Sequence, residues 1–235
     1  VIRLSFDVPS FDPHYSTTAL SVLTNIYDTL IIKNQNGEYI PNLAEEWTVS
    51  EDKLTYTFKL RKGVKFHNGE EFKASDVVFS INRVKASPYW ASQTAQINDA
   101  VALDDYTVKI TLIAPFAPFL STVKNCLNIV NEKAVTEAGE SYSDNPIGTG
   151  PYKFVSHDIE QNVVLERFDD YSQGLAPIKD AEFKIISDES TALIALETEE
   201  VDFIYNFPVI SRQNIIENPR LNLHEYQSVK IMYSL

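Results

Sequence analysis

The fold of this chain is decided by the stretch AEEWTVSEDKLTYTFKLRKGVKFHNGEEFKASDVVFS, residues 44–80. Apolar and polar residues alternate through its middle, which predicts a strand with one buried face. That face carries Leu54, Tyr56, Phe58 and Leu60. Gly63 and Gly69 then provide positions for turns that need positive φ. A helix capped by Ser75 or Asp76 follows, so the stretch predicts a hairpin-and-helix unit with a packed inner face.

The rest of the sequence alternates between strand patterns and helix patterns. The predicted strands are residues 1–6, 101–103, 106–112, 152–156, 162–167, 182–186, 201–205 and 221–226. The predicted helices are residues 18–30, 189–198 and 210–217. A turn-rich run, NPIGTGPY at residues 145–152, is the best candidate for a boundary between two units. This interleaving predicts an α/β fold with at least one mixed sheet.

Composition excludes several classes of function. The 235 residues carry a formal net charge of −13 and are 44% hydrophobic, which is typical of a globular protein with an acidic surface. Because nucleic-acid binding draws on Lys and Arg to neutralise phosphates, no nucleic-acid partner is expected. Cys126 is the single cysteine, so it forms no intrachain disulfide and is expected to fill apolar space. A strand pattern starts at Val1 with no leader before it, so a secretion signal of an exported protein is expected to have been removed already.

Motifs for catalysis and for metal binding are missing from the sequence. It contains neither a Gly-x-Ser-x-Gly nucleophile turn nor a His-Glu-x-x-His zinc motif. Its acidic pairs are adjacent in sequence, and neighbouring side chains diverge in both strands and helices. The four histidines show no ligand spacing, and each is expected at the surface or partly buried: His14, His67, His157 and His224. We therefore expect no enzyme, no metal site and no cofactor.

Five further segments, together with the opening stretch, resemble a known protein family in the right order. They are Asp12-Pro13-His14, residues 26–31, residues 145–152, residues 166–171, and residues 185–192 followed by Val201-Asp202. The order is similar to that of family 5 of the extracytoplasmic solute-binding proteins, which deliver peptides and nickel to ABC transporters. Two departures stand out. Members commonly carry a glycine where this chain has Glu199, and they continue beyond residue 235 into a second lobe.

The resemblance implies a fold of the type II periplasmic-binding-protein kind. It implies a mixed-sheet lobe with an inserted α/β subdomain, and the second lobe absent from this sequence. Residues 1–33 and 155–235 are expected to form the core of the first lobe, which ends at a hinge strand. Residues 34–154 are expected to form the inserted subdomain.

The function implied by the resemblance is ligand binding without catalysis. The chain is expected to be the substrate-binding component of an ABC importer, binding a dipeptide or an oligopeptide outside the cytoplasm and delivering it to permease subunits. A nickel chelate, haem or another small solute is an alternative ligand, and a cytoplasmic sensor domain of the same fold is an alternative role. Nickel-binding relatives hold an anionic chelate with arginines, and the stretch after Arg83 has none, which favours a peptide. The implied location is the periplasm, or the outer face of the cell membrane through a lipid anchor outside this sequence.

The ligand site implied by the resemblance lies between the lobes. The expected ligand-binding residues are Tyr15, Thr17, Thr18, Tyr89, Trp90, Asn206, Phe207 and Tyr233. Each group has a structural alternative. Thr17 or Thr18 can cap a helix, Tyr89 and Trp90 can pack on their own subdomain, and Asn206-Phe207 can simply end a strand.

Overall fold

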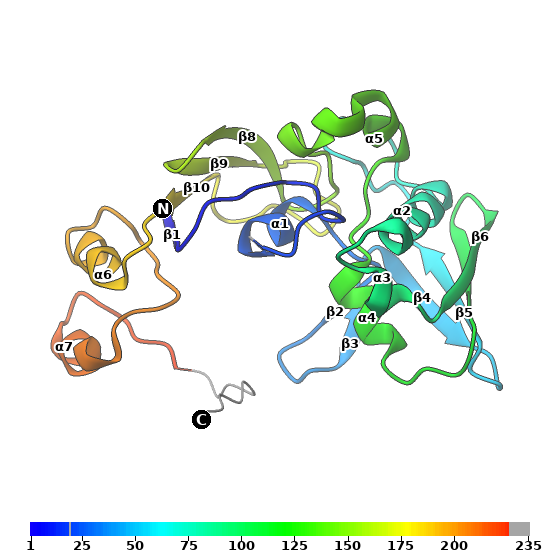
Figure 1. Cartoon of the computed structure of the whole chain (residues 1–235), viewed down its shortest axis with the longest axis horizontal. Coiled ribbons are helices and arrows are strands. Elements are labelled where there is room, and N and C mark those ends of the chain that lie inside the picture. Colours follow the sequence, from blue (N-terminus) through cyan, green and yellow to red (C-terminus); the bar gives the residue numbers. More distant parts are fainter. Residues whose placement is uncertain (19, 226–235) are drawn as a thin grey trace.

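The first of the two large sheets in the computed structural model, which describes residues 1–18 and 20–225, is mixed. Its strands are β1 (Ile2–Leu4), β10 (Asp180–Ile185), β9 (Asn162–Arg167) and β8 (Tyr152–Asp158), in that spatial order. β1 runs parallel to β10, whereas the β10–β9 and β9–β8 pairs are antiparallel. The predicted mixed sheet is therefore present (Figure 1).

The second large sheet is antiparallel and contains the opening stretch of the sequence. Its order is β4 (Ala44–Val49), β5 (Thr55–Leu60), β7 (Thr107–Leu112) and β6 (Ile97–Asp104). Phe58 and Leu60 of β5 are buried, and so are Val108 and Ile110 of β7, as the alternation predicts. Helix α2 (Ala74–Ala86) packs beside this sheet, and Val77, Ile81 and Val84 form its buried stripe.

The remaining elements are short. They are α1 (Leu20–Ile26), β2 (Ile31–Lys33), β3 (Tyr39–Pro41), α3 (Ala91–Thr94), α4 (Phe119–Cys126), α5 (Glu132–Ala138), η1 (Gly139–Asp144), α6 (Glu189–Glu197), η2 (Val209–Ser211) and α7 (Arg212–Glu217). Figure 1 shows α6 and α7 at the end of the molecule opposite the β4–β7 sheet. No helix in residues 1–18 and 20–225 is long and apolar enough to span a membrane.

Two hydrophobic clusters underlie the two sheets. One uses buried residues between Leu30 and Ile129 and lies with the β4–β7 sheet. The other uses buried residues of 4–27 and 130–183 and lies with the mixed sheet. These clusters support the proposed division into a core of residues 1–33 and 155–235 and an insert of residues 34–154, which stays a prediction.

Two glycines allow the chain to return from the insert. A Cβ atom on Gly148 would lie 2.0 Å from the carbonyl oxygen of Ile26, and one on Gly150 would lie 2.5 Å from that of Asn25. The amide of Gly150 donates to Ile26 O at 2.9 Å, so the returning segment touches the end of α1. Any side chain here would push the two segments apart, which explains the Gly-Thr-Gly sequence of the predicted boundary.

Several predicted element boundaries are wrong. Helix α2 begins at Ala74, one residue before the predicted caps, and Asp76 accepts the Lys73 amide at 2.9 Å from inside the first turn. Residues 201–205 form no strand, because only Phe203 bridges to Ile2. Residues 221–225 also lack strand structure, and Tyr226 of that predicted strand lies outside the described part of the chain. The predicted helix at residues 18–30 is shorter and spans Leu20–Ile26.

Glu199 adopts the left-handed backbone conformation that favours glycine, the residue that the resemblance implies at this position. Its φ is +63°, in the left-handed region that costs a residue with a Cβ about 1–2 kcal/mol. The preceding helix α6 ends at Glu197, so Glu199 turns the chain toward Val201, which is buried. The departure from the family pattern therefore leaves local strain.

Candidate functional site

Arg83 of α2 is the centre of a cluster on the Asp12–Ser16 loop, which precedes α1. Its Nη1 donates to Asp12 Oδ1 at 2.7 Å, and its Nη2 donates to Asp12 Oδ2. Both side chains are largely buried. The guanidinium carbon also lies 4.9 Å from the centre of the Tyr15 ring and 5.8 Å from that of Tyr142. We call Asp12, His14, Tyr15, Arg83 and Tyr142 the Arg83 cluster.

His14 is completely buried in this cluster, which corrects the expectation of a surface or partly buried imidazole. Its Nε2 lies 2.8 Å from Asn128 O and must donate, because a carbonyl oxygen can only accept. Its Nδ1 lies 3.1 Å from Arg83 Nη1 and must accept. The ring is therefore neutral, and burial lowers its pKa to about 4, with the Arg83 charge acting in the same direction.

The loop after α2 is fastened to the same segment. Ser87 Oγ donates to His14 O, and the Trp90 indole donates to Pro13 O at 3.2 Å. Trp90 also packs against the hydrophobic cluster of the insert. Two of the predicted site segments are thus brought together, and the packing of Trp90 on the insert is the one that its structural alternative describes, while its role in ligand binding stays a prediction.

The two tyrosines of these segments remain open to solvent. Tyr15 is 41% exposed and Tyr89 is 51% exposed. Thr17 and Thr18 are also exposed, and the Ser16 hydroxyl donates to Thr18 O at 3.2 Å in a local turn. These residues therefore form an accessible surface beside the Arg83 cluster, and their role in ligand binding stays a prediction.

A shallow pocket of about 220 Å³ lies where β1 ends. It is lined by Arg3, Leu4, Ser5, Phe6, Leu20, Ser21, Tyr205 and Asn206. In sheets with parallel strands, ligands bind outside the carboxyl ends of the strands, which is where this pocket is found. Asn206 is the predicted site residue that lines it, whereas Phe207 is half-buried and does not.

Arg3 carries the charge in this pocket but is already engaged. It is 2% exposed, and its Nε and Nη2 donate to Ile186 O and Ser187 O at 2.7 and 2.9 Å. The groups left for a ligand are the Ser5 and Ser21 hydroxyls, the Asn206 amide and exposed apolar side chains. The pocket therefore suits an uncharged stretch of ligand that offers hydrogen bonds and apolar groups.

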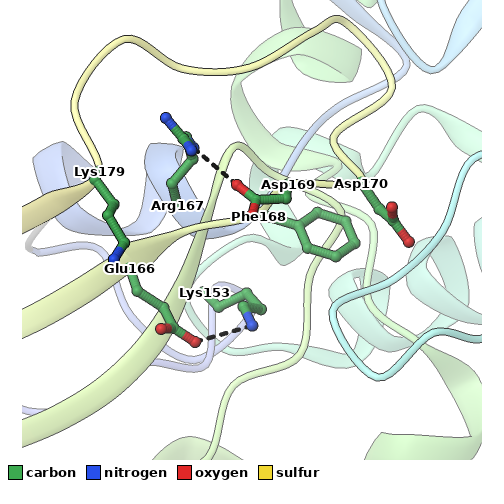
Figure 2. A pocket seen from close by; sticks show the side chains of 7 residues that line it. All are labelled: Lys153, Glu166, Arg167, Phe168, Asp169, Asp170 and Lys179. Atoms are coloured by element: carbon green, nitrogen blue, oxygen red, sulfur yellow. Dashed lines mark hydrogen bonds and ion pairs between the residues drawn. The ribbon is translucent and has the colours of Figure 1, made fainter.

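A second pocket, of about 240 Å³, is lined by charged side chains that neutralise one another (Figure 2). Lys153 pairs with Glu166 at 2.9 Å, and Arg167 pairs with Asp169 at 2.8 Å. Another lining residue, Asp170, pairs with Lys65 of the insert at 2.7 Å. These ion pairs, one of which reaches Lys65, explain the cluster, so it is a weak candidate for a ligand site.

Sequence reasoning missed several residues of the first pocket. Phe6, Leu20 and Tyr205 are exposed apolar side chains beside it, at 52%, 50% and 56% exposure. A solvent-facing Phe at the end of a strand pattern was the available signal for Phe6. Tyr233, the predicted hinge residue, lies outside the residues that the structure describes.

Metal and thiol chemistry have little support in the described part of the chain. Among residues 1–18 and 20–225, no group of three or more His, Cys, Asp or Glu side chains is placed to hold a metal ion. Cys126 is buried as predicted, and burial raises its thiol pKa to about 11.

Comparison with known proteins places this geometry in a family. The sequence profile of the bacterial extracellular solute-binding proteins, family 5, matches residues 38–234. The glutathione-binding protein GsiB of Pectobacterium atrosepticum is 31% identical over 98% of this chain and 48% of its own length. The chain spans about half the length of the curated relatives it matches.

Solved structures agree with the sequence matches. DppA of Helicobacter pylori in complex with the peptide STSA is 31% identical, with a TM-score of 0.85 over 93% of this chain and 48% of that one. NikZ of Campylobacter jejuni in complex with Ni(L-His) is 28% identical, with the same TM-score over 93% of this chain and 45% of that one. The architecture is that of one lobe of a type II periplasmic binding protein. The chain belongs to the family 5 bacterial extracellular solute-binding proteins.

Proposed function

We propose that this chain is the first lobe of a peptide-binding protein that serves an ABC importer. The peptide would be captured outside the cytoplasm and passed to membrane permease subunits. The observation that carries the proposal is the lining of the β1 pocket, which offers hydroxyl, amide and apolar groups while the buried guanidinium of Arg3 donates to backbone carbonyls. A peptide backbone can be held there by main-chain and hydroxyl hydrogen bonds.

Closure of a second lobe would complete the site. Phe6, Leu20 and Tyr205 at the pocket are exposed apolar side chains that a second lobe can cover, and Val209 and Ile210 are 84% and 92% exposed. Covering the pocket would remove water and strengthen every polar contact to the ligand. The charged ends of the peptide would then be held by the second lobe.

A nickel chelate is the second candidate, because NikZ resembles this chain and was solved with Ni(L-His). A chelate with a net negative charge would need free cations. Arg83 donates to Asp12 and His14, and Arg3 donates to Ile186 and Ser187, so both arginines beside the candidate surface are engaged. This favours the peptide.

Calorimetry on the full-length two-lobed protein tests the proposal. We expect heat of binding from a pool of dipeptides and tripeptides and none from nickel with histidine. The 235-residue chain alone should bind the same pool far more weakly, because it presents half of the contacts. Tight binding of the nickel chelate with no response to peptides would overturn the proposal, as would equal tight peptide affinity of the single lobe. Native mass spectrometry of the purified protein would identify haem or another small solute carried in its place.

A further inference from the structure

The Arg83 cluster connects the insert to the surface that carries Tyr15. Arg83 lies near the end of α2, which packs on the β4–β7 sheet, whereas Asp12 lies in the loop between β1 and α1 of the core. The two residues are 71 positions apart in sequence and share two hydrogen bonds. A helix of the insert thus reaches into the core at the place where the Asp12–Ser16 loop turns toward solvent.

The hydrogen-bonding capacity of this guanidinium is directed at the protein. Nη1 donates to both Asp12 Oδ1 and His14 Nδ1, and Nη2 donates to Asp12 Oδ2. One face of the plane lies under the ring of Tyr15. Arg83 is therefore placed to orient other groups, since its charge is balanced and largely buried.

The loop depends on these contacts for its shape. Asp12 Oδ1 also accepts the amide of His14 at 3.0 Å, and Asp12 O accepts the amide of Tyr15 at 3.2 Å. The Asp12 carboxylate, which accepts the His14 amide, is thus the same group that receives both hydrogen bonds from the Arg83 guanidinium. Without the Arg83 guanidinium, the Asp12 carboxylate would be a buried charge without a counterion, and the loop would rearrange to hydrate it.

We propose that Arg83 is a positioning residue that holds Tyr15 and the Asp12–Ser16 loop in the geometry that binds ligand. The insert then contributes to ligand affinity through α2, without touching the ligand. This inference rests on the proposed peptide-binding function for its affinity arm. Lysine cannot replace Arg83, because an ammonium group is a point charge and lacks the planar fork that engages Asp12 and His14 together.

Hydrogen exchange followed by mass spectrometry tests the positioning without any ligand. In Arg83→Lys and Arg83→Met, we expect amides of residues 12–16 to exchange about tenfold faster than in the parent, because the groups that fix the loop are released. Val163→Ala is the control, since it removes buried methyl groups from the core cluster without removing any hydrogen-bonding group of the Arg83 cluster. The control should leave this stretch protected even if it lowers overall stability.

Peptide affinity supplies the second arm, measured by calorimetry on the full-length protein. Arg83→Lys should weaken binding about tenfold, and Val163→Ala should leave it unchanged. The Tyr15→Ala, Arg83→Lys double variant should be no weaker than Tyr15→Ala alone, because Arg83 would act through that ring.

The two arms separate the possible failures. Unchanged exchange at residues 12–16 in both Arg83 variants overturns the inference, whether or not peptides bind. Parent-like affinity of Arg83→Lys, or an additive double variant, overturns it as well. A parent protein that binds no peptide refutes the proposed function, and the exchange result then decides by itself whether Arg83 positions the loop.

Discussion

Lowering the pH from about 7.5 to about 5 is expected to destabilise this chain through two neutral histidines. His67 repeats the arrangement of His14: its Nε2 lies 3.0 Å from Gly150 O, and its Nδ1 accepts the amide of Gly148 at 3.3 Å. Burial lowers the pKa of each ring to about 4. Protonation would place a donor against a donor at Nδ1, so each ring resists taking a proton while the chain is folded.

The magnitude follows from linkage. An unfolded histidine titrates near pH 6.5, so the unfolded state gains protons before the folded state does. The loss therefore begins as the pH falls below about 6.5 and is complete below about pH 4, at about 1.4 kcal/mol per pH unit for each ring. At about pH 5 each ring should have cost the fold about 2 kcal/mol, a large part of the stability of an ordinary domain.

Urea unfolding at the two pH values, followed by the fluorescence of Trp47 and Trp90, measures this loss. In His67→Gln the amide can still donate to Gly150 O but does not titrate, so the difference between the two pH values should shrink by about 2 kcal/mol. His224→Gln is the matched control, because His224 is exposed and should leave the difference unchanged. An unaltered pH difference in His67→Gln would refute the reasoning.

Three other substitutions or treatments test features of the fold. Glu199→Gly should raise the free energy of unfolding by about 1 kcal/mol because it relieves the positive φ, whereas Glu200→Gly should lower it; a lower melting temperature for Glu199→Gly contradicts the strain. Gly148→Ala should cost about 3 kcal/mol or more, because its Cβ would collide with Ile26 O, while Gly174→Ala meets open space and should cost only about 1 kcal/mol for its φ of +97°. Equal losses in thermal unfolding would show that the crossing of the two segments is loose. Cys126 should react with a thiol reagent orders of magnitude more slowly in the folded chain than in urea, because burial raises its pKa to about 11. Fast labelling of the folded chain would mean that α4 opens readily.

Local pattern was sufficient for most of the sheets. Strand β5 and its buried face follow from strict alternation, since a strand with one face in the core must alternate. Residues 201–205 are likewise rich in β-branched and aromatic residues but pair with β1 only at Phe203, because β1 is three residues long and already pairs with β10 on its other side. Whether a segment pairs as a strand depends on its neighbouring strand as much as on the segment itself. A single sequence does not show which neighbour a segment will have.

The candidate site was predictable in part for a related reason. Tyr15, Tyr89 and Asn206 lie on accessible surface as expected, because loops after strands and helices tend to face solvent. The role of Trp90 as a donor to Pro13 O, and the burial of His14 beside Arg83, depend on contacts between segments far apart in sequence. No periodicity encodes such contacts, so the Arg83 cluster emerges only from the fold.

The point where the chain leaves the core and the point where it returns lie within one hydrogen bond of each other, from Gly150 N to Ile26 O. The segment of more than a hundred residues between Ile26 and Gly150 thus begins and ends at the same place in the fold. With such an arrangement we expect that the residues between these two points could be lost, exchanged or enlarged without moving any strand of the mixed sheet. The exception is the Asp12–Ser16 loop, because Arg83 of α2 donates to Asp12. Any exchange that preserves this surface therefore has to supply an arginine at the same position near the end of α2.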